Sequence, residues 1–374
     1  MVRFVDGWDR SLRVLVAMSG GVDSAVAAHL LRRAGHEVAG ATMRLFCHAW
    51  QDGPRNPCCD TDAIREARRS ADVMGIAHTV VDMGEVFERE VVEDFVREYA
   101  AGRTPNPCVR CNTRVKFDPF LEKARRMGFD AVATGHYVRR ALAGDSDPGW
   151  ALYRGRDREK DQSYVLWELP RWQLGRCLFP LGGARKAAVR RLARRLGLPA
   201  WSRPESQDIC FVPNGEQAGF LAGRLPAEHA MRRRGPVRAL DGTLLGEHDG
   251  LLGLTIGQRR GMGIAGGRRL YVIRIEPETA TLWLGPREAT LSGGLVATSG
   301  NLLAPLDMLE GPGVMARIRY RHVGAPCRVS VRDGTWEVRF ARPEGAITPG
   351  QSVVLYRGDR MLGGARIDAA MPAG

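Results

Sequence analysis

Apolar segments and amphipathic segments alternate from residue 12 to about residue 137. The apolar segments predict four β-strands, at 12–17, 37–43, 77–82 and 130–134. Between them, apolar residues recur at helical spacing and predict helices at 23–34, 60–74, 85–101 and 116–127. A glycine stands where each helix has to end, at Gly35, Gly75, Gly102 and Gly128. Strands that alternate with helices in this way are typical of an α/β fold with a parallel, Rossmann-like sheet.

Ligands of such sheets bind beyond the carboxyl ends of the strands. We therefore expect the segments after Met18, Met43 and Thr134 to converge on one crevice, with Gly135 and His136 at its border.

The rest of the chain has a different pattern. A turn-rich break at 143–149 precedes a predicted helix at 184–197 that is apolar on one side. The chain is rich in glycine and loops from about residue 215. From about residue 295, alternating residues predict strands at 315–321, 327–331 and 336–340, with a turn at Asp333-Gly334, as in a small antiparallel β-barrel. We predict three domains, at 1–214 with the parallel sheet, at 215–294 as a small central domain and at 295–374 with the barrel.

The charge of the chain favours a polyanionic partner. Its 374 residues include 55 Lys and Arg against 42 Asp and Glu, a net charge of +13. Cations dominate the other side of the predicted 184–197 helix, namely Arg185, Lys186, Arg190, Arg191, Arg194 and Arg195. Such a face is either solvated or in contact with phosphates, and a genome rich in Arg codons would raise the Arg count without any function.

The cysteines are better interpreted as reduced thiols than as a disulfide framework. No apolar run is long enough to span a membrane and the first residues lack a secretory apolar segment, so we expect a cytoplasmic protein. In that compartment the eight cysteines would be reduced, and would be reactive, metal-binding or merely buried. They are Cys47, Cys58, Cys59, Cys108, Cys111, Cys177, Cys210 and Cys327.

The turn after the first strand carries the strongest chemical motif. It reads Ser-Gly-Gly-Val-Asp-Ser from Ser19 to Ser24 and leads into a predicted helix, whose first N–H groups would face an anion. Glycines let the backbone curl around a phosphate, the hydroxyls can donate to it, and Asp23 can help to hold Mg²⁺. An ordinary capped turn is the alternative. A Walker loop is excluded because none of the four lysines follows a glycine. The motif resembles the PP-loop of the ATP pyrophosphatase family.

A second motif, Thr104 to Asn112, contains Cys108 and Cys111. Its two prolines predict a rigid loop between two helices. A Cys-x-x-Cys pair can be half of a zinc site, a redox dithiol, a reactive thiol with a neighbour, or two ordinary thiols. The flanking cations Arg103, Arg110 and Arg114 would lower a thiol pKa and favour reactivity. Cys210, in Ser-Gln-Asp-Ile-Cys-Phe, could equally be a buried strand residue.

Together, the PP-loop, Asn-Pro-x-x-x-Cys-Asn and Ser-Gln-Asp-Ile-Cys-Phe closely resemble the bacterial tRNA-specific 2-thiouridylase family. The likeness extends through 155–157, 160–164, 255–261 and 317–321, nearly the whole chain. It implies an N-terminal PP-loop domain of the adenine nucleotide alpha hydrolase type. It also implies that ATP adenylates the 2-oxygen of the wobble uridine and that persulfide sulfur then displaces AMP.

The resemblance also implies roles for individual residues. Cys210 would carry the persulfide, and Cys111 would free the sulfur and pair with Cys210 in a transient disulfide. A sulfur-relay protein or cysteine desulfurase would supply the sulfur to a monomeric enzyme. The nucleotide-binding residues would be Ala17, Met18, Ser19, Gly20, Gly21, Val22, Asp23, Ser24, Met43 and Gly135. The residues that contact tRNA would be Asn106, Pro107, Cys108, His136, Lys160, Asp161, Gln162, Arg319, Tyr320 and Gln351.

One residue departs from the family pattern, which has an Asp at the position of Cys108. A thiol cannot accept hydrogen bonds as a carboxylate does, so an acid–base role does not carry over. Cys108, Cys111 and Cys210 together suggest a three-thiolate iron–sulfur site as a hypothesis.

Two other functions fit parts of the sequence. A PP-loop ligase acting on a small molecule would not need the cysteines, and a non-enzymatic tRNA-binding protein would not need an intact PP-loop.

Overall fold

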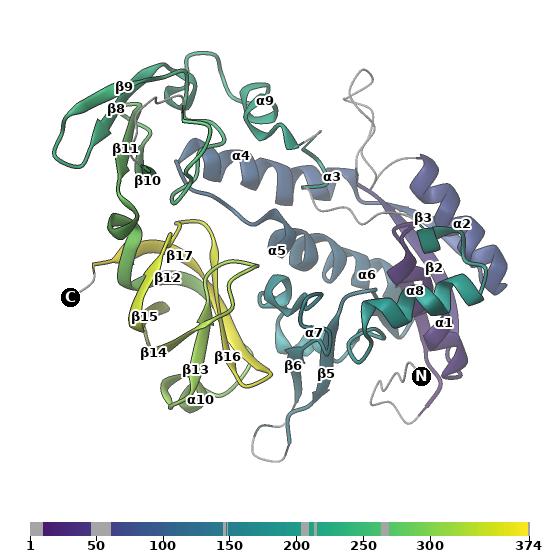
Figure 1. Cartoon of the computed structure of the whole chain (residues 1–374). Coiled ribbons are helices and arrows are strands. Elements are labelled where there is room, and N and C mark those ends of the chain that lie inside the picture. Colours follow the sequence, from purple (N-terminus) through teal and green to yellow (C-terminus); the bar gives the residue numbers. More distant parts are fainter. Residues whose placement is uncertain are drawn as a thin grey trace.

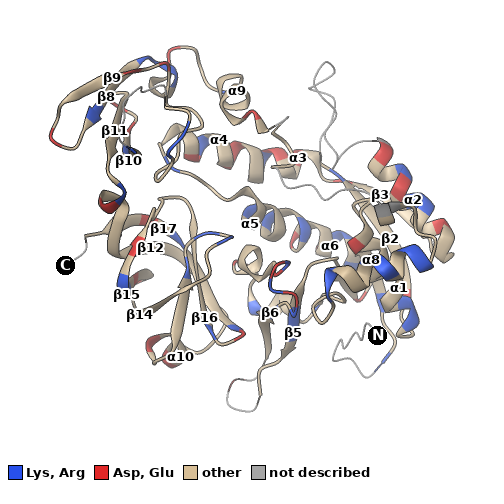
Figure 2. Cartoon of the chain, in the orientation of Figure 1, with Lys and Arg blue, Asp and Glu red and all other residues tan. Residues whose placement is uncertain are grey.

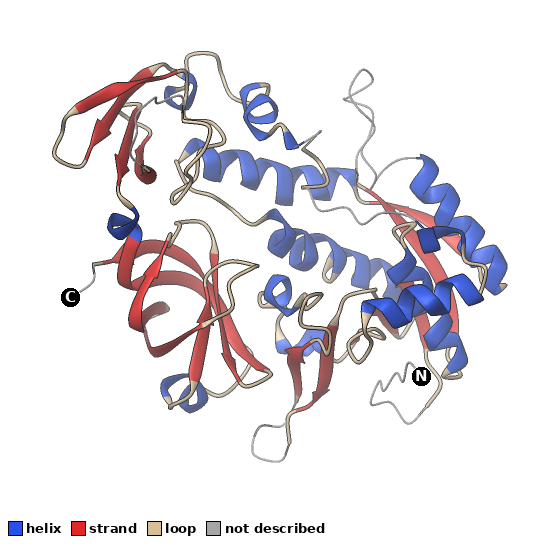
Figure 3. Cartoon of the chain, viewed as in Figure 1, coloured by secondary structure: helices blue, strands red, loops and turns tan. Residues whose placement is uncertain are grey.

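The computed structural model describes residues 10–45, 61–144, 147, 149–202, 209–212, 215–262 and 269–372. Cys47, Cys58, Cys59 and residues 206–208 of the Cys210 motif lie outside the described residues. The chain forms three parts in order: a sheet covered by helices, a small second sheet and a β-barrel (Figure 1, Figure 3). No helix of the described residues is long and apolar enough to cross a membrane.

The first sheet is parallel and has β1 at its centre. Its order is β3 (His78–Asp82), β2 (Glu37–Arg44), β1 (Arg13–Ala17), β4 (Ala131–Ala133) and β7 (Cys177–Leu178). Successive residues of β1 face opposite hydrophobic clusters, because Leu15 packs into one and Val14 and Val16 into the other. The four predicted strands are confirmed. β7 was missed because two residues carry no periodic signal.

Helices cover both faces of this sheet. They include α1 (Val22–Arg33), α2 (Thr61–Met74) and α8 (Lys186–Arg195), which lies beside α1 (Figure 1). The predicted 85–101 helix is a rod of α3 (Gly84–Phe87), the π-helical η1 (Glu88–Val92) and α4 (Glu93–Ala100). Gly35, Gly75, Gly102 and Gly128 all have positive φ, which confirms the predicted helix ends.

The prediction of a loop over 104–112 holds for 104–106 and is wrong from Pro107 on. Helix α5 (Pro107–Cys111) is followed by the π-helical η2 (Asn112–Lys116), and α6 (Pro119–Arg126) begins three residues later than predicted. Proline at the first helical position has no N–H to leave unpaired. The Asn106 side chain caps α5 by accepting a hydrogen bond from Cys108 N at 3.1 Å. Pro107 therefore starts a helix here instead of preventing one.

The central part forms a four-stranded sheet in the order β10, β11, β8, β9. These strands are Tyr271–Glu276, Thr281–Gly285, Gly235–Ala239 and Leu244–His248. Its short helices are α9 (Gln217–Ala222) and the 3₁₀ turns η6 (Ala230–Arg232) and η7 (Arg287–Thr290).

The C-terminal strands form the predicted antiparallel barrel. Its strands are β12 (Leu291–Leu302), β13 (Val314–Arg317), β14 (Ala325–Arg332), β15 (Thr335–Gly345), β16 (Ser352–Arg357) and β17 (Arg360–Met371), with α10 (Leu306–Glu310) after β12. Pairing of β12 with both β15 and β17 closes the barrel. Asp333 and Gly334 have φ of 49° and 76° and form the predicted hairpin turn.

Two details of the barrel differ from the prediction. β13 ends at Arg317, so 318–321 is not strand; the Arg317 side chain donates to the carbonyls of Tyr320 and His322 and closes a loop there. The hairpin of β5 (Val138–Leu142) and β6 (Trp150–Arg154) leaves the N-terminal part and joins the barrel sheet through β6 and β17. Between β6 and α8 lie η3 (Ser163–Leu166) and α7 (Arg171–Leu174), and η4 (Pro199–Ser202) follows α8.

Candidate functional site

The PP-loop lies between the carboxyl end of β1 and the first turn of α1. Gly21 is the N-cap of α1 and offers no side-chain cap to the first N–H groups of the helix. Ser24 shapes the loop from inside, because its hydroxyl donates to Gly21 O at 3.1 Å and accepts from Ser19 N at 3.2 Å. The loop thus presents backbone N–H groups and the positive end of a helix, an arrangement that suits a phosphate.

Two glycines let neighbouring backbones press against this loop. Gly20 has φ of 72°, and a Cβ there would lie 2.5 Å from Ala63 O at the start of α2. A Cβ on Gly135 would lie 2.8 Å from Ser24 N. Ser24, which follows β1, and Gly135, which follows β4, are therefore adjacent, and both are expected to bind the nucleotide. Ala17, Met18 and Val22 are buried under the loop, and Met43 is partly buried one strand away.

Asp23, in the first turn of α1, is held by two other segments. Its Oδ1 accepts from the Tyr137 hydroxyl at 2.7 Å, and its Oδ2 lies 2.6 Å from Lys186 Nζ at the start of α8. Each carboxylate oxygen thus has one partner, and Lys186 offsets the charge. Because each oxygen keeps a second lone pair, the expected role of Asp23 as a Mg²⁺ ligand stays a prediction.

Lys186 and Tyr137 were missed as site residues. The sequence signal for Lys186 was hidden, because it is one cation among six on the predicted 184–197 helix. Figure 2 shows how densely Lys and Arg cover α8. Only the packing of α8 against α1 separates Lys186, which is buried, from the exposed arginines behind it.

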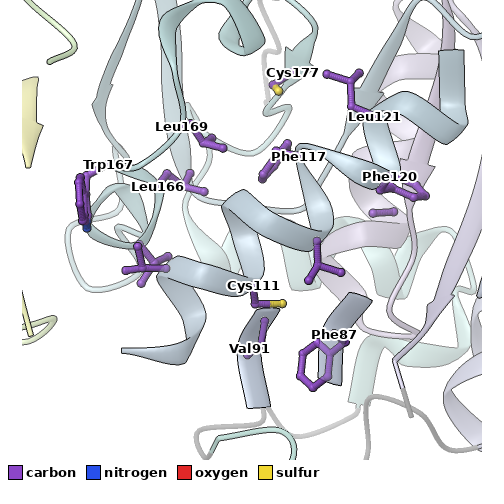
Figure 4. Packing of buried hydrophobic residues seen from close by; sticks show 14 of the residues in the cluster. Phe87, Val91, Cys111, Phe117, Phe120, Leu121, Leu166, Trp167, Leu169 and Cys177 are labelled. Atoms are coloured by element: carbon purple, nitrogen blue, oxygen red, sulfur yellow. The ribbon is translucent and has the colours of Figure 1, made fainter. Parts of the chain in front are cut away.

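Cys111 and Cys210 pack against one hydrophobic cluster. Cys111 is 7% exposed and lies near Val91 and Phe87 (Figure 4), whereas Cys108 on the same helix is exposed. Cys210 is partly buried against this cluster, and the ring of the next residue, Phe211, lies 5.7 Å from that of Phe87. Ala17 and Met43, which are expected to bind the nucleotide, also belong to the cluster or contact it. Thus the strand ends near the PP-loop and both cysteine segments share one core.

The thiols themselves are not linked in this structure. Of the described cysteines, Cys108, Cys111, Cys177, Cys210 and Cys327 are all free of disulfides. No three His, Cys, Asp or Glu side chains gather as a metal site within the described residues. The structure therefore does not assemble the hypothetical iron–sulfur site.

Two of the three arginines that were expected to lower a thiol pKa are paired with acidic side chains. Arg103 pairs with Glu98. Arg110 lies 3.6–3.7 Å from Glu90, Asp94 and Glu168. Because acidic side chains compensate these two charges, they add little positive potential at the cysteines.

Residues expected to contact tRNA come together where the barrel meets the N-terminal part. Asp161 is buried and accepts from Gly155 N, Ser163 N and, at 3.1 Å, Arg317 Nη1. Arg317 holds the barrel loop that carries Arg319 and Tyr320, both exposed. Partial burial raises the pKa of Tyr320, and the charges of the nearby Asp161 and Cys108 raise it further. Lys160 and Gln162 flank Asp161 and are partly buried.

Gln351 anchors the segment that enters α5. Its side-chain amide donates to Thr104 O at 2.8 Å and to Pro105 O at 3.3 Å. Thr104 N in turn donates to Pro349 O at 2.9 Å. The barrel thus fixes the start of the helix that carries Cys108 and Cys111, just before the cap Asn106 and the buried Pro107.

His136 is buried and neutral. Its Nδ1 shares a 2.7 Å hydrogen bond with Thr134 Oγ1, and its ring lies 6.0 Å from that of Phe117 and 6.4 Å from that of Phe179. Burial, aided by Lys116, lowers the pKa of His136 from 6.5 to about 3. In this position His136 shapes the site from within.

His136 is expected to make the protein less stable as the pH falls below 6.5. The unfolded chain binds a proton through 6.5 whereas the folded chain does not until about 3, so stability is lost over this window. At about pH 5.5 the loss from this residue is about 1.4 kcal/mol relative to about pH 7.5. Urea unfolding at both pH values checks it, with His136→Asn as the variant that should lose less. Equal losses in both proteins would contradict this account.

Replacing Arg317 by Met is expected to cost about 3 kcal/mol of stability, because it leaves the buried Asp161 with Arg154, at 3.4 Å, as its cationic partner and removes the donors to Tyr320 O and His322 O. The double variant Asp161→Asn/Arg317→Met should recover part of that. The exposed pair Arg339–Glu337 supplies the control, and Arg339→Met should cost less than about 1 kcal/mol. Urea unfolding measures all three, and equal costs for the two arginines would refute a buried, coupled pair.

The chain matches three family models. A model described as tRNA methyl transferase HUP domain matches residues 12–214, the tRNA methyl transferase PRC-barrel domain matches 220–286, and the Aminomethyltransferase beta-barrel domain matches 292–367. It is similar over 374 residues, at 47% identity, to a tRNA-specific 2-thiouridylase MnmA of Geobacter metallireducens, covering 97% of this chain and 98% of the relative. A protein of the same name from Thermus thermophilus is 48% identical over 369 residues, 95% of this chain and 94% of the relative.

Proposed function

The chain belongs to the tRNA-specific 2-thiouridylase family, and from this premise we propose that it replaces the 2-oxygen of the wobble uridine of tRNA by sulfur, with consumption of ATP. The observation that carries the proposal is the shared hydrophobic cluster. Ala17 and Cys111 belong to it, and Met43 and Cys210 pack against it, so the strand ends expected to bind the nucleotide and both cysteine segments contact one core. Activation and sulfur transfer would then take place at one site.

The first step of the proposed reaction is adenylation. The uridine 2-oxygen bonds to the α-phosphorus of ATP, the bond from that phosphorus to the bridging oxygen breaks, and pyrophosphate leaves. The 2-oxygen is then bound as a phosphate ester and can depart with AMP. The N-terminus of α1 would hold the phosphates, in a loop whose shape depends on the close packing of Gly20 against Ala63 and of Gly135 against Ser24. Mg²⁺ would accompany ATP on its own phosphate oxygens.

The second step is sulfur transfer. The outer sulfur of a Cys210 persulfide bonds to uridine C2, and AMP leaves with the 2-oxygen. The Cys111 thiolate then attacks Cys210 Sγ, and the bond from Sγ to the transferred sulfur breaks. That sulfur keeps the electron pair and remains on the base as the 2-thio group, and a Cys111–Cys210 disulfide forms. A thiol reductant would restore both cysteines, and a persulfide donor protein would reload Cys210.

We propose that tRNA lies over the junction of α5 with the barrel. Support comes from the exposed Cys108, Arg319 and Tyr320, which converge there, and from the net charge of +13. Lys160 and Gln162 would add contacts, while the buried His136, Asp161 and Pro107 would act by fixing the surface. Gln351 would act through Thr104 and Asn106. The enzyme would work as a cytoplasmic monomer.

Pyrophosphate release with and without tRNA tests this proposal against its two alternatives. A 2-thiouridylase should release pyrophosphate only when tRNA is present. Release without RNA that is indifferent to Cys111→Ser and Cys210→Ser would favour a small-molecule ligase. No release in either condition would favour a tRNA-binding protein without enzymatic activity.

The iron–sulfur hypothesis needs a separate measurement. Iron and sulfide would be determined in protein purified without oxygen. Colourless protein that thiolates tRNA at full rate without iron would exclude a cluster on Cys108, Cys111 and Cys210.

A further inference from the structure

Lys186 places a positive charge in the wall of the PP-loop. It is the first residue of α8 and only 8% exposed, and its Nζ lies 2.6 Å from Asp23 Oδ2. The chain has only four lysines among its 55 basic residues, so a lysine in this Arg-rich helix stands out. An ammonium is a compact point charge, which suits a confined phosphate site better than a planar guanidinium does.

Three segments fix the position of Lys186. Asp157 Oδ2 accepts from its backbone N at 2.8 Å, and its Nζ lies 5.8 Å from the centre of the Tyr137 ring. Tyr137 in turn donates to the second oxygen of Asp23. Gly135 packs against Asp23 and Ser24, since a Cβ there would lie 2.9 Å from Asp23 Cβ and 2.8 Å from Ser24 N. A lysine held this way loses little conformational entropy when a ligand arrives.

A phosphate group at the loop would meet both charges of this pair. The Asp23 carboxylate, in the first turn of α1, would repel the phosphate if its charge were not neutralised. Lys186 neutralises it and, with three N–H donors on its ammonium, can contact more than one oxygen. The side chain of Asp23 is 31% exposed and that of Lys186 10%, so the Asp23 end of the pair borders the open side of the loop.

We propose that Lys186 contacts the phosphates of bound ATP and stabilises the leaving pyrophosphate, and that Asp23 positions it. This inference rests on the proposed function, since it names a further residue for its adenylation step. When the bond between the α-phosphorus and the bridging oxygen breaks, negative charge moves onto pyrophosphate, and a fixed ammonium lowers the energy of that state.

Direct ATP binding without tRNA, measured by calorimetry, tests the proposal. Lys186→Met should weaken ATP affinity about tenfold or more, while Arg194→Met, an exposed cation on the same helix, should leave it unchanged. Pyrophosphate release in the presence of tRNA should fall about a hundredfold in Lys186→Met.

The double variant Asp23→Asn/Lys186→Met separates the proposal from a purely structural ion pair, and it removes the unpaired carboxylate that would destabilise the single variant. If Lys186 contacts phosphate, the double variant regains only the part of the affinity that the unpaired Asp23 carboxylate cost, and it still binds ATP clearly more weakly than wild type. If Lys186 only neutralises Asp23, the double variant regains wild-type affinity, and the proposal is overturned. Wild-type ATP affinity in Lys186→Met overturns it as well. A wild-type chain that binds ATP but thiolates no tRNA would instead refute the proposed function, and the affinities would still decide the role of Lys186.

Discussion

Serine at position 111 or 210 is expected to abolish thiolation of tRNA and to leave tRNA affinity within about twofold of wild type. A hydroxyl cannot carry a persulfide or attack one, and the thiolate is the side chain suited to both steps. Neither cysteine is exposed, and both contact the hydrophobic cluster, so the exchange changes little of the surface that meets RNA. Thiolation assays and tRNA binding on the two variants measure these effects.

Cys327→Ser is the matched control. Burial raises the pKa of Cys327 to about 12, which keeps it protonated and unreactive, and serine can keep its contact to Val314 O. This variant should thiolate at the wild-type rate. Because adenylation precedes sulfur transfer, Cys210→Ser should also still release pyrophosphate in a single turnover with tRNA. Full thiolation in either the Cys111 or the Cys210 variant would contradict the proposed sulfur transfer.

Alanine at Gly20 is expected to reduce pyrophosphate release about a hundredfold, through loss of ATP positioning. Gly20 has φ of 72°, and its Cβ would lie 2.5 Å from Ala63 O, a backbone atom that cannot move without shifting α2. The loop therefore has to move, and the N–H groups of α1 no longer converge on the phosphate. Calorimetry of ATP binding should show the same loss.

Gly35→Ala is the control that introduces the strain of a positive φ without a steric clash. Gly35 has φ of 92°, but nothing lies within 4 Å of the position of its Cβ. Alanine there should cost about 1 kcal/mol of stability and leave ATP affinity unchanged. If both variants bind ATP equally well, the close packing at Gly20 does not serve the nucleotide.

The fold could be predicted wherever it depends on local pattern. The four longer strands of the parallel sheet, the helix ends at Gly35 and Gly75 and the hairpin at Asp333-Gly334 all follow from periodicity and backbone conformation. The strand β7 could not be predicted, because two residues form it only through pairing with β4. The sequence does not indicate helix α5, because two prolines normally exclude regular structure, whereas Pro107 lies at the first helical position, which tolerates proline.

The site could be predicted as a set of motifs but not as an arrangement. Gly20 can be predicted from sequence because its demand, a φ of 72°, is local to the loop. The Asp161–Arg317 pair joins residues 156 positions apart, and the Lys186–Asp23 pair joins residues 163 apart. The hydrophobic periodicity of the sequence does not indicate such contacts, since they form only when separate elements pack together.

Mass spectrometry of wobble nucleosides tests the central claim most directly. Unmodified tRNA would be incubated with the protein, ATP and a persulfide donor labelled with heavy sulfur, and then digested. The account predicts 2-thiouridine that carries the label, formed only with ATP and absent with Cys210→Ser. Wobble uridine without labelled sulfur, or labelled 2-thiouridine formed equally well by Cys210→Ser, would contradict it.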